Sequence, residues 1–242
     1  MEETNISQEQ NPLGAAPVGG LILKFAIPAI ISMLVSAMYN IVDQIFIGQG
    51  VGMLGNAATN VAFPVTTIAT ALALLLGIGG ASNYNLEMGA GREQRASSIA
   101  GTALSTLVIT GAVLALVVLL FLRPLLGLFG ATTDVMPYAV DYLGITAVGL
   151  PFYVLSIGGN HIVRADRSPT YSMTCVLTGA VINTILDPLF IFGFGWGIKG
   201  AAWATVIGQV VSGILVVIYF GKFRKMYLEM SMLKPSSECL KA

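Results

Sequence analysis

Charged residues are scarce in this sequence. Lys, Arg, Asp and Glu together make up 10% of the 242 residues, and 55% of the residues are hydrophobic, whereas soluble domains carry about 25% charged residues. A chain with so few charges cannot cover a water-facing surface, which excludes a soluble globular domain. The formal net charge is zero, so the composition indicates no polyanionic partner and no nucleic acid.

Motifs for common enzyme and metal chemistries are also missing. The chain has no G-x-x-x-x-G-K-[ST] loop that would cradle the phosphates of ATP. It contains neither H-E-x-x-H nor a zinc-spaced Cys/His cluster. Its aspartates do not occur in a G-x-G-D context, which argues against an intramembrane aspartyl protease. We therefore expect a protein that is no enzyme and that needs no cofactor.

Long apolar runs dominate what the sequence does contain. A helix that spans a bilayer needs about 20 consecutive apolar residues. Six runs meet this requirement, and their connections are short, which favours antiparallel neighbours in one bundle. The predicted fold is an all-α membrane protein with a six-transmembrane-helix bundle. The expected spans are Leu21–Ile47, Asn56–Gly80, Ser98–Leu122, Val135–Gly159, Thr170–Phe192 and Gly200–Phe220.

The basic residues predict the orientation of these spans. If the N-terminus is cytoplasmic, 10 of the 12 Lys and Arg residues fall on the cytoplasmic side, and Arg123 and Lys199 remain outside. Such a bias follows the positive-inside rule. We expect a multi-pass protein of the inner (cytoplasmic) membrane, surrounded by lipid, with both termini cytoplasmic. Residues 1–20 form the N-terminal tail, residues 21–220 the membrane lobe, and residues 221–242 a cytoplasmic linker that ends early.

Two acidic residues inside the spans are the candidates for chemistry. Asp43 and Asp187 would each cost roughly 2.5–3.5 kcal/mol at the bilayer centre, so a function is the default interpretation. At 1.5 Å per residue, Asp43, Asp187 and Thr205 all lie roughly 8–10 Å below the outer surface. Asn183 is one turn deeper than Asp187, on the same helix face. Another acid, Asp141, falls near the outer end of its span and is expected at the interface.

Oxygen atoms from three helices can therefore meet at one depth. Carboxylate, amide and hydroxyl oxygens suit a hard cation such as Na⁺, for which we name Asp187, Asn183 and Thr205 as ligands. The same carboxylates could instead carry a proton. The alternative is that these groups only form hydrogen bonds between helices. Pro28 lies 15 residues before Asp43 and is a candidate hinge, because proline removes a helix hydrogen bond.

Several motifs resemble the multidrug and toxic compound extrusion (MATE) family over about residues 20–222. The first span contains F-A-I-P-A-I and Y-N-I-V-D-Q, and the stretch from Arg164 to Gln209 contains R-x-x-x-x-P, N-x-x-x-D-P and G-x-x-G-A-A-x-A-T in order. The resemblance implies twelve helices in two lobes around a central cavity, and export of cationic drugs by antiport with Na⁺ or H⁺. It also implies a cation site at Asp187, Asn183 and Thr205, with Asp43 close by, and a first helix that bends at Pro28.

The chain departs from that pattern because it holds one lobe. We expect a fragment, namely the N-terminal half, that lacks its C-terminal lobe; a half-size protein that pairs with a second copy is the alternative. Tyr39 and Gln44 are expected to line the substrate cavity. Two other functions remain open: a related flippase for lipid-linked saccharides, and a non-transporting half that binds a partner lobe. Neither the drug nor the coupling ion can be read from the sequence.

Overall fold

A bundle of long helices without strands makes up residues 18–223, the part of the chain that the computed structural model describes. Six of these helices are long and apolar enough to cross a membrane, which confirms the predicted fold class. The elements are α2 (Val18–Gly50), α3 (Met53–Gly89), α4 (Glu93–Leu120), α5 (Leu122–Leu128), α6 (Met136–Ala165), α7 (Pro169–Pro188) and α8 (Ile198–Ile218). Two short π-helical segments, η1 (Leu189–Gly193) and η2 (Tyr219–Phe223), continue α7 and α8.

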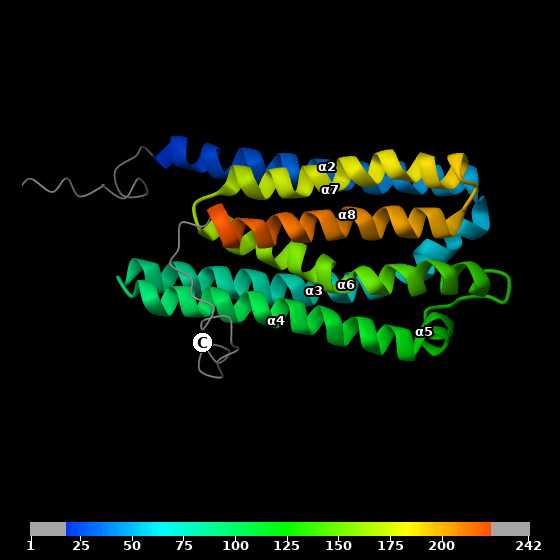
Figure 1. Ribbon diagram of the computed structural model, residues 1–242, viewed down its shortest axis with the longest axis horizontal. Coiled ribbons are helices and arrows are strands. Elements are labelled where there is room, and N and C mark those ends of the chain that lie inside the picture. Colours follow the sequence, from blue (N-terminus) through cyan, green and yellow to red (C-terminus); the bar gives the residue numbers. More distant parts are fainter. Residues whose placement is uncertain (1–17, 224–242) are drawn as a thin grey trace, which may run out of the picture.

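Helix α6 lies at the centre of the bundle. It packs against α3 and α4 on one side and against α8 on the other, while α2 contacts mainly α7 (Figure 1). Figure 1 also shows that α2 begins and α8 ends at the same end of the bundle. We call this the basic end, because Arg92, Arg95, Arg164, Arg167 and Lys222 flank the helices there. The predicted N-terminal tail and most of the predicted linker lie outside the described residues.

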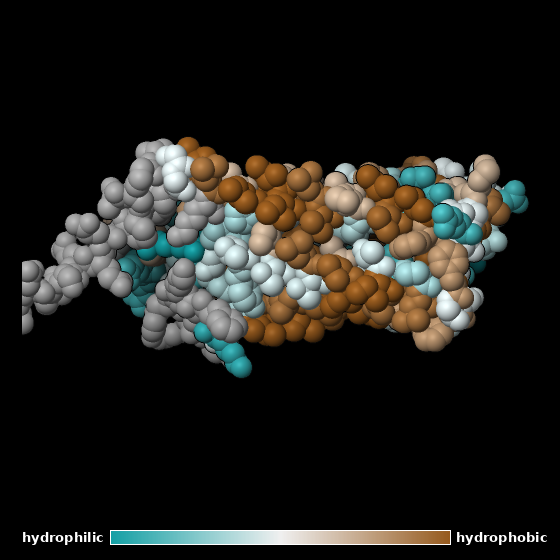
Figure 2. All heavy atoms as spheres, turned by 90° about the horizontal axis from the view of Figure 1, so that it is seen from above, coloured by the Kyte–Doolittle hydropathy of each residue, from teal (hydrophilic) through white to brown (hydrophobic). Residues whose placement is uncertain are grey.

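The outside of the bundle is apolar along its middle. Hydrophobic side chains cover the central part of the face in Figure 2, and hydrophilic ones gather toward the two ends. Met33 and Leu75, for example, are 73% and 70% exposed. A soluble protein of this size would not expose so large a contiguous apolar surface, so the surface fits a lipid environment.

Several helices are longer than the predicted spans. Helix α3 continues to Gly89 and α6 to Ala165, so the connections left between the predicted spans, residues 81–97 and 160–169, shrink to residues 90–92 and 166–168. Hydropathy marks where a helix leaves the apolar layer, but the backbone hydrogen bonds continue beyond it. The short helix α5 was not predicted. On the other side, the expected loop of residues 48–55 shrinks to Val51 and Gly52, and the loop before α8 covers residues 194–197.

Pro188 changes the helix geometry directly after Asp187. Proline has no N–H group to bond with the carbonyl four residues earlier. The chain continues as the π-helical segment η1, in which the Phe194 N–H donates to the Leu189 carbonyl five residues back at 3.0 Å. Such π segments inside helices are frequent at functional sites. Pro28, in contrast, lies within one uninterrupted α-helical stretch of α2.

Glycines set the distance between the central helices. A Cβ atom on Gly77 of α3 would lie 2.5 Å from the Cα of Gly158 in α6. The same test on Gly111 of α4 places a Cβ 2.6 Å from the Cα of Pro151 in α6. Both contacts are with backbone, which cannot move aside as a flexible side chain does. These two glycines therefore permit the close approach of α3 and α4 to α6, as expected of small residues in membrane bundles.

This packing predicts different effects on stability for alanine substitutions at two nearby glycines, Gly77 and Gly79. Gly77→Ala should lower the melting temperature of the detergent-solubilised protein, because the methyl group separates α3 from α6. Gly79→Ala is the matched control, since nothing lies within 4 Å of a Cβ at that position. It should be neutral or stabilising by up to about 1 kcal/mol through helix propensity. Equal melting temperatures for the two variants would contradict the packing argument.

Candidate functional site

Two buried carboxyl groups meet between α2 and α7. Asp43 of α2 is 7% exposed and Asp187 of α7 is fully buried. Their side chains are neighbours that interact electrostatically. Two carboxylate charges at this distance repel strongly where no water screens them, so the pair requires a proton or a cation to be stable.

Polar groups on α7, α8 and α6 complete the cluster. The Asn183 side-chain amide is 3.4 Å from Oδ1 of Asp187 and 3.5 Å from Oγ1 of Thr205, to which its Nδ2 donates. Tyr142 of α6, a residue that the sequence reasoning did not name, lies beside Thr205 and close to both acids. The structure therefore brings together all four residues selected by depth counting: Asp43, Asn183, Asp187 and Thr205.

A mutual glycine contact positions the α7 and α8 members of the cluster. A Cβ on Gly179 would lie 2.9 Å from the Gly208 carbonyl oxygen, and a Cβ on Gly208 would lie 2.8 Å from the Gly179 carbonyl oxygen. Gly179 is one turn from Asn183, and Gly208 is about one turn from Thr205. The close helix crossing thus brings the amide of Asn183 within reach of the Thr205 hydroxyl.

Three oxygen atoms of the cluster have no hydrogen-bond partner within residues 18–223. They are Oδ1 of Asp43, Oδ2 of Asp187 and Oδ1 of Asn183, and all three are buried. A buried acceptor without a partner costs about 1–3 kcal/mol. These atoms, which belong to two carboxyl groups and one amide, form a set of hard oxygen ligands. The donor set therefore fits a cation such as Na⁺, and it equally fits protons on the carboxyl groups.

The surroundings supply no positive charge to the acid pair. Neither Asp43 nor Asp187 takes part in any ion pair formed by residues within the described part of the chain. Residues 18–223 also contain no group of three or more His, Cys, Asp or Glu side chains that could hold a metal ion. The third intramembrane acid, Asp141, instead pairs with Lys199 at 3.3 Å near the opposite end from the basic end.

The remaining predicted residues lie around the cluster. Tyr39, one turn before Asp43, is close enough to interact electrostatically with Asp43 and with Tyr153 of α6. Gln44 points away from the acid pair toward α3, where its Oε1 accepts a hydrogen bond from Thr59 at 3.1 Å. The roles of Tyr39 and Gln44 in a substrate cavity, and of Pro28 as a hinge, stay predictions.

The fold and this cluster invite comparison with known membrane proteins. The model of the MatE family matches residues 28–189, which include Asp43, Asn183 and Asp187. The chain belongs to the MATE family. The matched stretch contains α3 to α7 entirely and most of α2. The resemblance carried by the first-span and Arg164–Gln209 motifs is therefore confirmed at the level of the family.

Relatives and solved structures of MATE proteins agree on the extent of the match. The chain is 34% identical over 222 residues to the FAD transporter of Shewanella oneidensis, covering 87% of this chain and 48% of the relative. It is 28% identical to the multidrug export protein MepA of Staphylococcus aureus, covering 93% and 50%. A solved structure of the MATE multidrug transporter DinF-BH matches with a TM-score of 0.87 and 37% identity, covering 95% and 52%. The chain thus spans about half the length of these relatives.

A third buried acid lies at the basic end of the MATE lobe. Asp166, 3% exposed, accepts hydrogen bonds from the hydroxyls of Tyr219 at 2.6 Å and Tyr84 at 3.3 Å. The Tyr219 hydroxyl also lies 2.8 Å from that of Ser168. Asp166 falls in the connection between the fourth and fifth predicted spans. Its tyrosine partners are 82 and 53 residues away, so no local sequence pattern indicates its burial. This group joins α3 and η2 to the turn between α6 and α7.

The Asp166 group predicts a stability effect. Tyr219→Phe should lower the melting temperature in detergent, because the buried Asp166 carboxyl loses its shortest hydrogen bond, at a cost of about 1–3 kcal/mol. Tyr171→Phe is the control, since the neighbouring Tyr171 hydroxyl donates to the Leu215 carbonyl and a neutral hydrogen bond contributes less, about 1 kcal/mol. The assignment is wrong if Tyr219→Phe is no less stable than Tyr171→Phe.

Proposed function

We propose that this MATE lobe is half of a secondary active exporter that moves cationic organic compounds out of the cell in exchange for Na⁺ or H⁺. The observation that supports the proposal best is the buried contact between Asp43 and Asp187, with unpartnered oxygens and no basic partner among the described residues. Such a site costs free energy unless a cation or proton occupies it. The MATE relatives named above are transporters, which agrees with a transport function rather than an enzymatic one.

In this proposal, the coupling ion controls the position of α2. Without it, repulsion between Asp43 and Asp187 pushes α2 away from α7. With Na⁺ or protons bound, the two carboxyl groups attract a shared charge or form a hydrogen bond, and the helices close. Pro28 lies 15 residues before Asp43 and would absorb the change in direction. The substrate is released when the closed form binds the substrate more weakly than the open form does.

Ion exchange supplies enough free energy for export without ATP. Moving a compound against a thousandfold gradient costs about 4.1 kcal/mol, at about 1.4 kcal/mol per tenfold ratio. One elementary charge that crosses 100 mV releases about 2.3 kcal/mol, and a chemical gradient of the ion adds to this. One or two ions per cycle are therefore sufficient.

The charge distribution supports an orientation with the basic end in the cytoplasm. Arg92, Arg95, Arg164, Arg167 and Lys222 lie at that end, whereas Arg123 and Lys199 lie at the other. By the positive-inside rule, we infer that both ends of the described chain face the cytoplasm and that the lobe resides in the cytoplasmic membrane. The acid cluster then lies in the outer half of the bilayer.

A partner lobe completes the proposed transporter. The match to about half of each relative fits a second six-helix lobe or a second copy of this chain on the other side of a central cavity. The alternative function, a lipid-linked saccharide flippase, requires basic side chains deep in the membrane to hold a pyrophosphate. The Arg and Lys side chains on the described helices lie toward the helix ends, which favours the exporter.

The proposal is tested by removing one carboxylate. In the complete two-lobe transporter, expressed in drug-sensitive cells, Asp187→Asn should abolish efflux of a fluorescent cationic dye while expression stays normal. The amide cannot hold the charge of the coupling ion. Dye retention should match that of cells with empty vector. Efflux from vesicles with imposed Na⁺ or pH gradients then identifies the ion.

A matched control is available at the other membrane acid. Asp141→Asn removes a carboxylate of the same size, but one that is 42% exposed and paired with Lys199. It should leave efflux within about twofold of the wild type, since exposed ion pairs contribute little. Normal efflux by Asp187→Asn would overturn the ion-site assignment.

A further inference from the structure

A small apolar core closes the acid cluster on the side that faces away from the basic end. Four side chains that are at most 4% exposed form this core, which we call the outer plug: Ile47, Ile191, Ile198 and Ala201. Tyr142, which lies beside Thr205 and close to both acids, also packs against the plug. Tyr142 therefore connects the plug to the acid cluster.

Three of the plug residues lie one helical turn from members of the acid cluster. Ile47 follows Asp43 by four residues in α2, and Ile191 of η1 follows Asp187 by four. Both α2 and α7 begin at the basic end, so these isoleucines lie farther from that end than the acids do (Figure 1). Helix α8 runs in the opposite direction, and there Ala201 precedes the threonine of the cluster by four residues. Three segments of the chain therefore supply a polar group and, one turn outward, an apolar side chain.

Glycines allow the plug to pack closely. A Cβ on Gly50, in the last turn of α2, would overlap Cγ2 of Ile191. A Cβ on Gly200 would lie 2.8 Å from the carbonyl carbon of Phe190, so α8 also approaches η1 closely. Phe46 of α2 and Phe192 of η1 pack edge to face, with ring centroids 6.3 Å apart. The end of α2 is therefore packed directly against η1.

An apolar plug blocks the passage of water and ions. Its aliphatic side chains offer no hydrogen bond, so a Na⁺ ion that passed between them would lose its hydration without compensation. Hydrophobic constrictions close channels by excluding water in the same way. The acid pair is therefore closed toward this end of the bundle while the plug stays packed.

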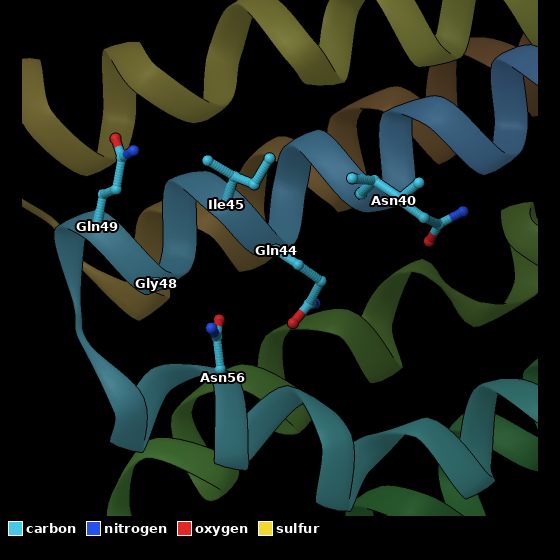
Figure 3. A pocket seen from close by; sticks show the side chains of 7 residues that line it. Asn40, Gln44, Ile45, Gly48, Gln49 and Asn56 are labelled. Atoms are coloured by element: carbon cyan, nitrogen blue, oxygen red, sulfur yellow. The ribbon is translucent and has the colours of Figure 1, made fainter.

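The opposite side of α2 leaves room for the helix to move. Ile45 is two residues from both Asp43 and Ile47, so at about 100° per residue it points to the other side of α2. Ile41 and Ile45 are 62% and 49% exposed. A hollow of about 600 Å³, lined mainly by residues of α2, runs along this stretch. Figure 3 shows Gln44 pointing toward α3 and Ile45 pointing away from it. The end of α2 can therefore shift away from η1 with few packed side chains lost.

We propose that the outer plug is the gate through which the coupling ion, Na⁺ or a proton carried by water, reaches the acid pair. The gate is closed while Ile47 and Ile191 pack in one cluster, and it opens when the end of α2 moves away from η1. Repulsion between Asp43 and Asp187 acts in the opening direction, because each acid lies one turn from a plug residue on its own segment. An empty site therefore opens its own entrance, and an occupied site closes it.

The role of this gate in export rests on the proposed exchange of Na⁺ or H⁺. Access of a water-soluble reagent to the acids does not depend on transport and can be measured without it. Normal efflux by Asp187→Asn would overturn the ion site but not the closure of the plug. A negative labelling result would overturn the gate but not the ion site.

The test labels carboxyl groups of the 242-residue chain in detergent micelles. A water-soluble carbodiimide, with glycine ethyl ester as the nucleophile, modifies carboxyl groups that water reaches, and mass spectrometry of peptides locates the label. Asp141, whose side chain is 42% exposed, should react readily and serves as the internal reference. Asp43 and Asp187 should react at least about tenfold more slowly than Asp141, because they react only through a local opening.

Truncation of the plug should open this route. Ile47→Ala should raise the labelling rate of Asp43 and Asp187, relative to Asp141, at least about tenfold, which corresponds to an opening that costs about 1.4 kcal/mol less. Ile162→Ala is the matched control, because it truncates an equally buried isoleucine near the basic end. It should leave the rate within about twofold of the wild type, since distant sites act independently.

A glycine pair tests the same gate without removing a plug side chain. Gly50→Ala should also raise the labelling rate, because the added methyl group pushes Ile191 away from α2. Gly127→Ala, with nothing within 4 Å of its Cβ, is the control in the short helix α5 and should label as the wild type does. Elution profiles on size exclusion identify a variant that misfolds, and Gly50→Ala then serves in place of Ile47→Ala.

A second reagent separates access from protonation. Dicyclohexylcarbodiimide reacts with the same protonated carboxyl groups but enters through the apolar phase, so its rate should be alike in the wild type and the plug variants. The inference is overturned if the two buried acids of the wild type react with the water-soluble reagent as fast as Asp141. It is also overturned if folded plug variants label as slowly as the wild type, if Ile162→Ala raises the rate equally, or if both reagents respond equally to the plug variants.

Discussion

The contact between Asp43 and Asp187 is the constraint on which this lobe depends. Both carboxyl groups are buried, and they are neighbours that interact with each other. Two negative charges at this distance cannot persist without compensation in an apolar environment. Residues nearby supply oxygens rather than positive charge, so the compensation has to come from outside the protein, as a proton or a cation. The cluster is therefore a site that links the occupancy of an ion to the separation of two helices.

The rest of the packing determines which helix responds. Reciprocal contact between Gly179 and Gly208 holds α7 and α8 together, and α6 is enclosed by α3, α4 and α8. Helix α2 packs mainly on α7 and exposes much of its remaining surface, with Met33 73% and Met38 64% exposed. Repulsion between the acids therefore acts between a fixed helix and a loosely held one. Movement of α2 disturbs the fewest packed side chains.

Sequence reasoning succeeded where one physical rule operates alone. Bilayer thickness fixes the length of an apolar run, so the six membrane helices were predictable. The constant rise of a helix placed Asp43, Asp187 and Thr205 at one depth, with Asn183 one turn deeper. It failed where partners are distant in the chain. Tyr142 joins the cluster from α6, and Asp166 is buried by Tyr84 and Tyr219. No local sequence pattern indicates either of these contacts. The ends of α3 and α6 were missed because helical hydrogen bonding continues after hydropathy falls.

Helix α2 connects the acid pair to α3. Asp43 and Gln44 are consecutive residues, yet one contacts α7 and the other bonds to Thr59 on α3. Successive side chains on an α-helix are about 100° apart, so a single rigid segment presents both groups to different neighbours. Any shift that separates Asp43 from Asp187 must also change the contact between Gln44 and Thr59. Ion occupancy and the packing of α2 against α3 are then linked by one rigid body, and the linkage is reciprocal, because a ligand that prefers one position of α2 alters the affinity for the ion by the same factor.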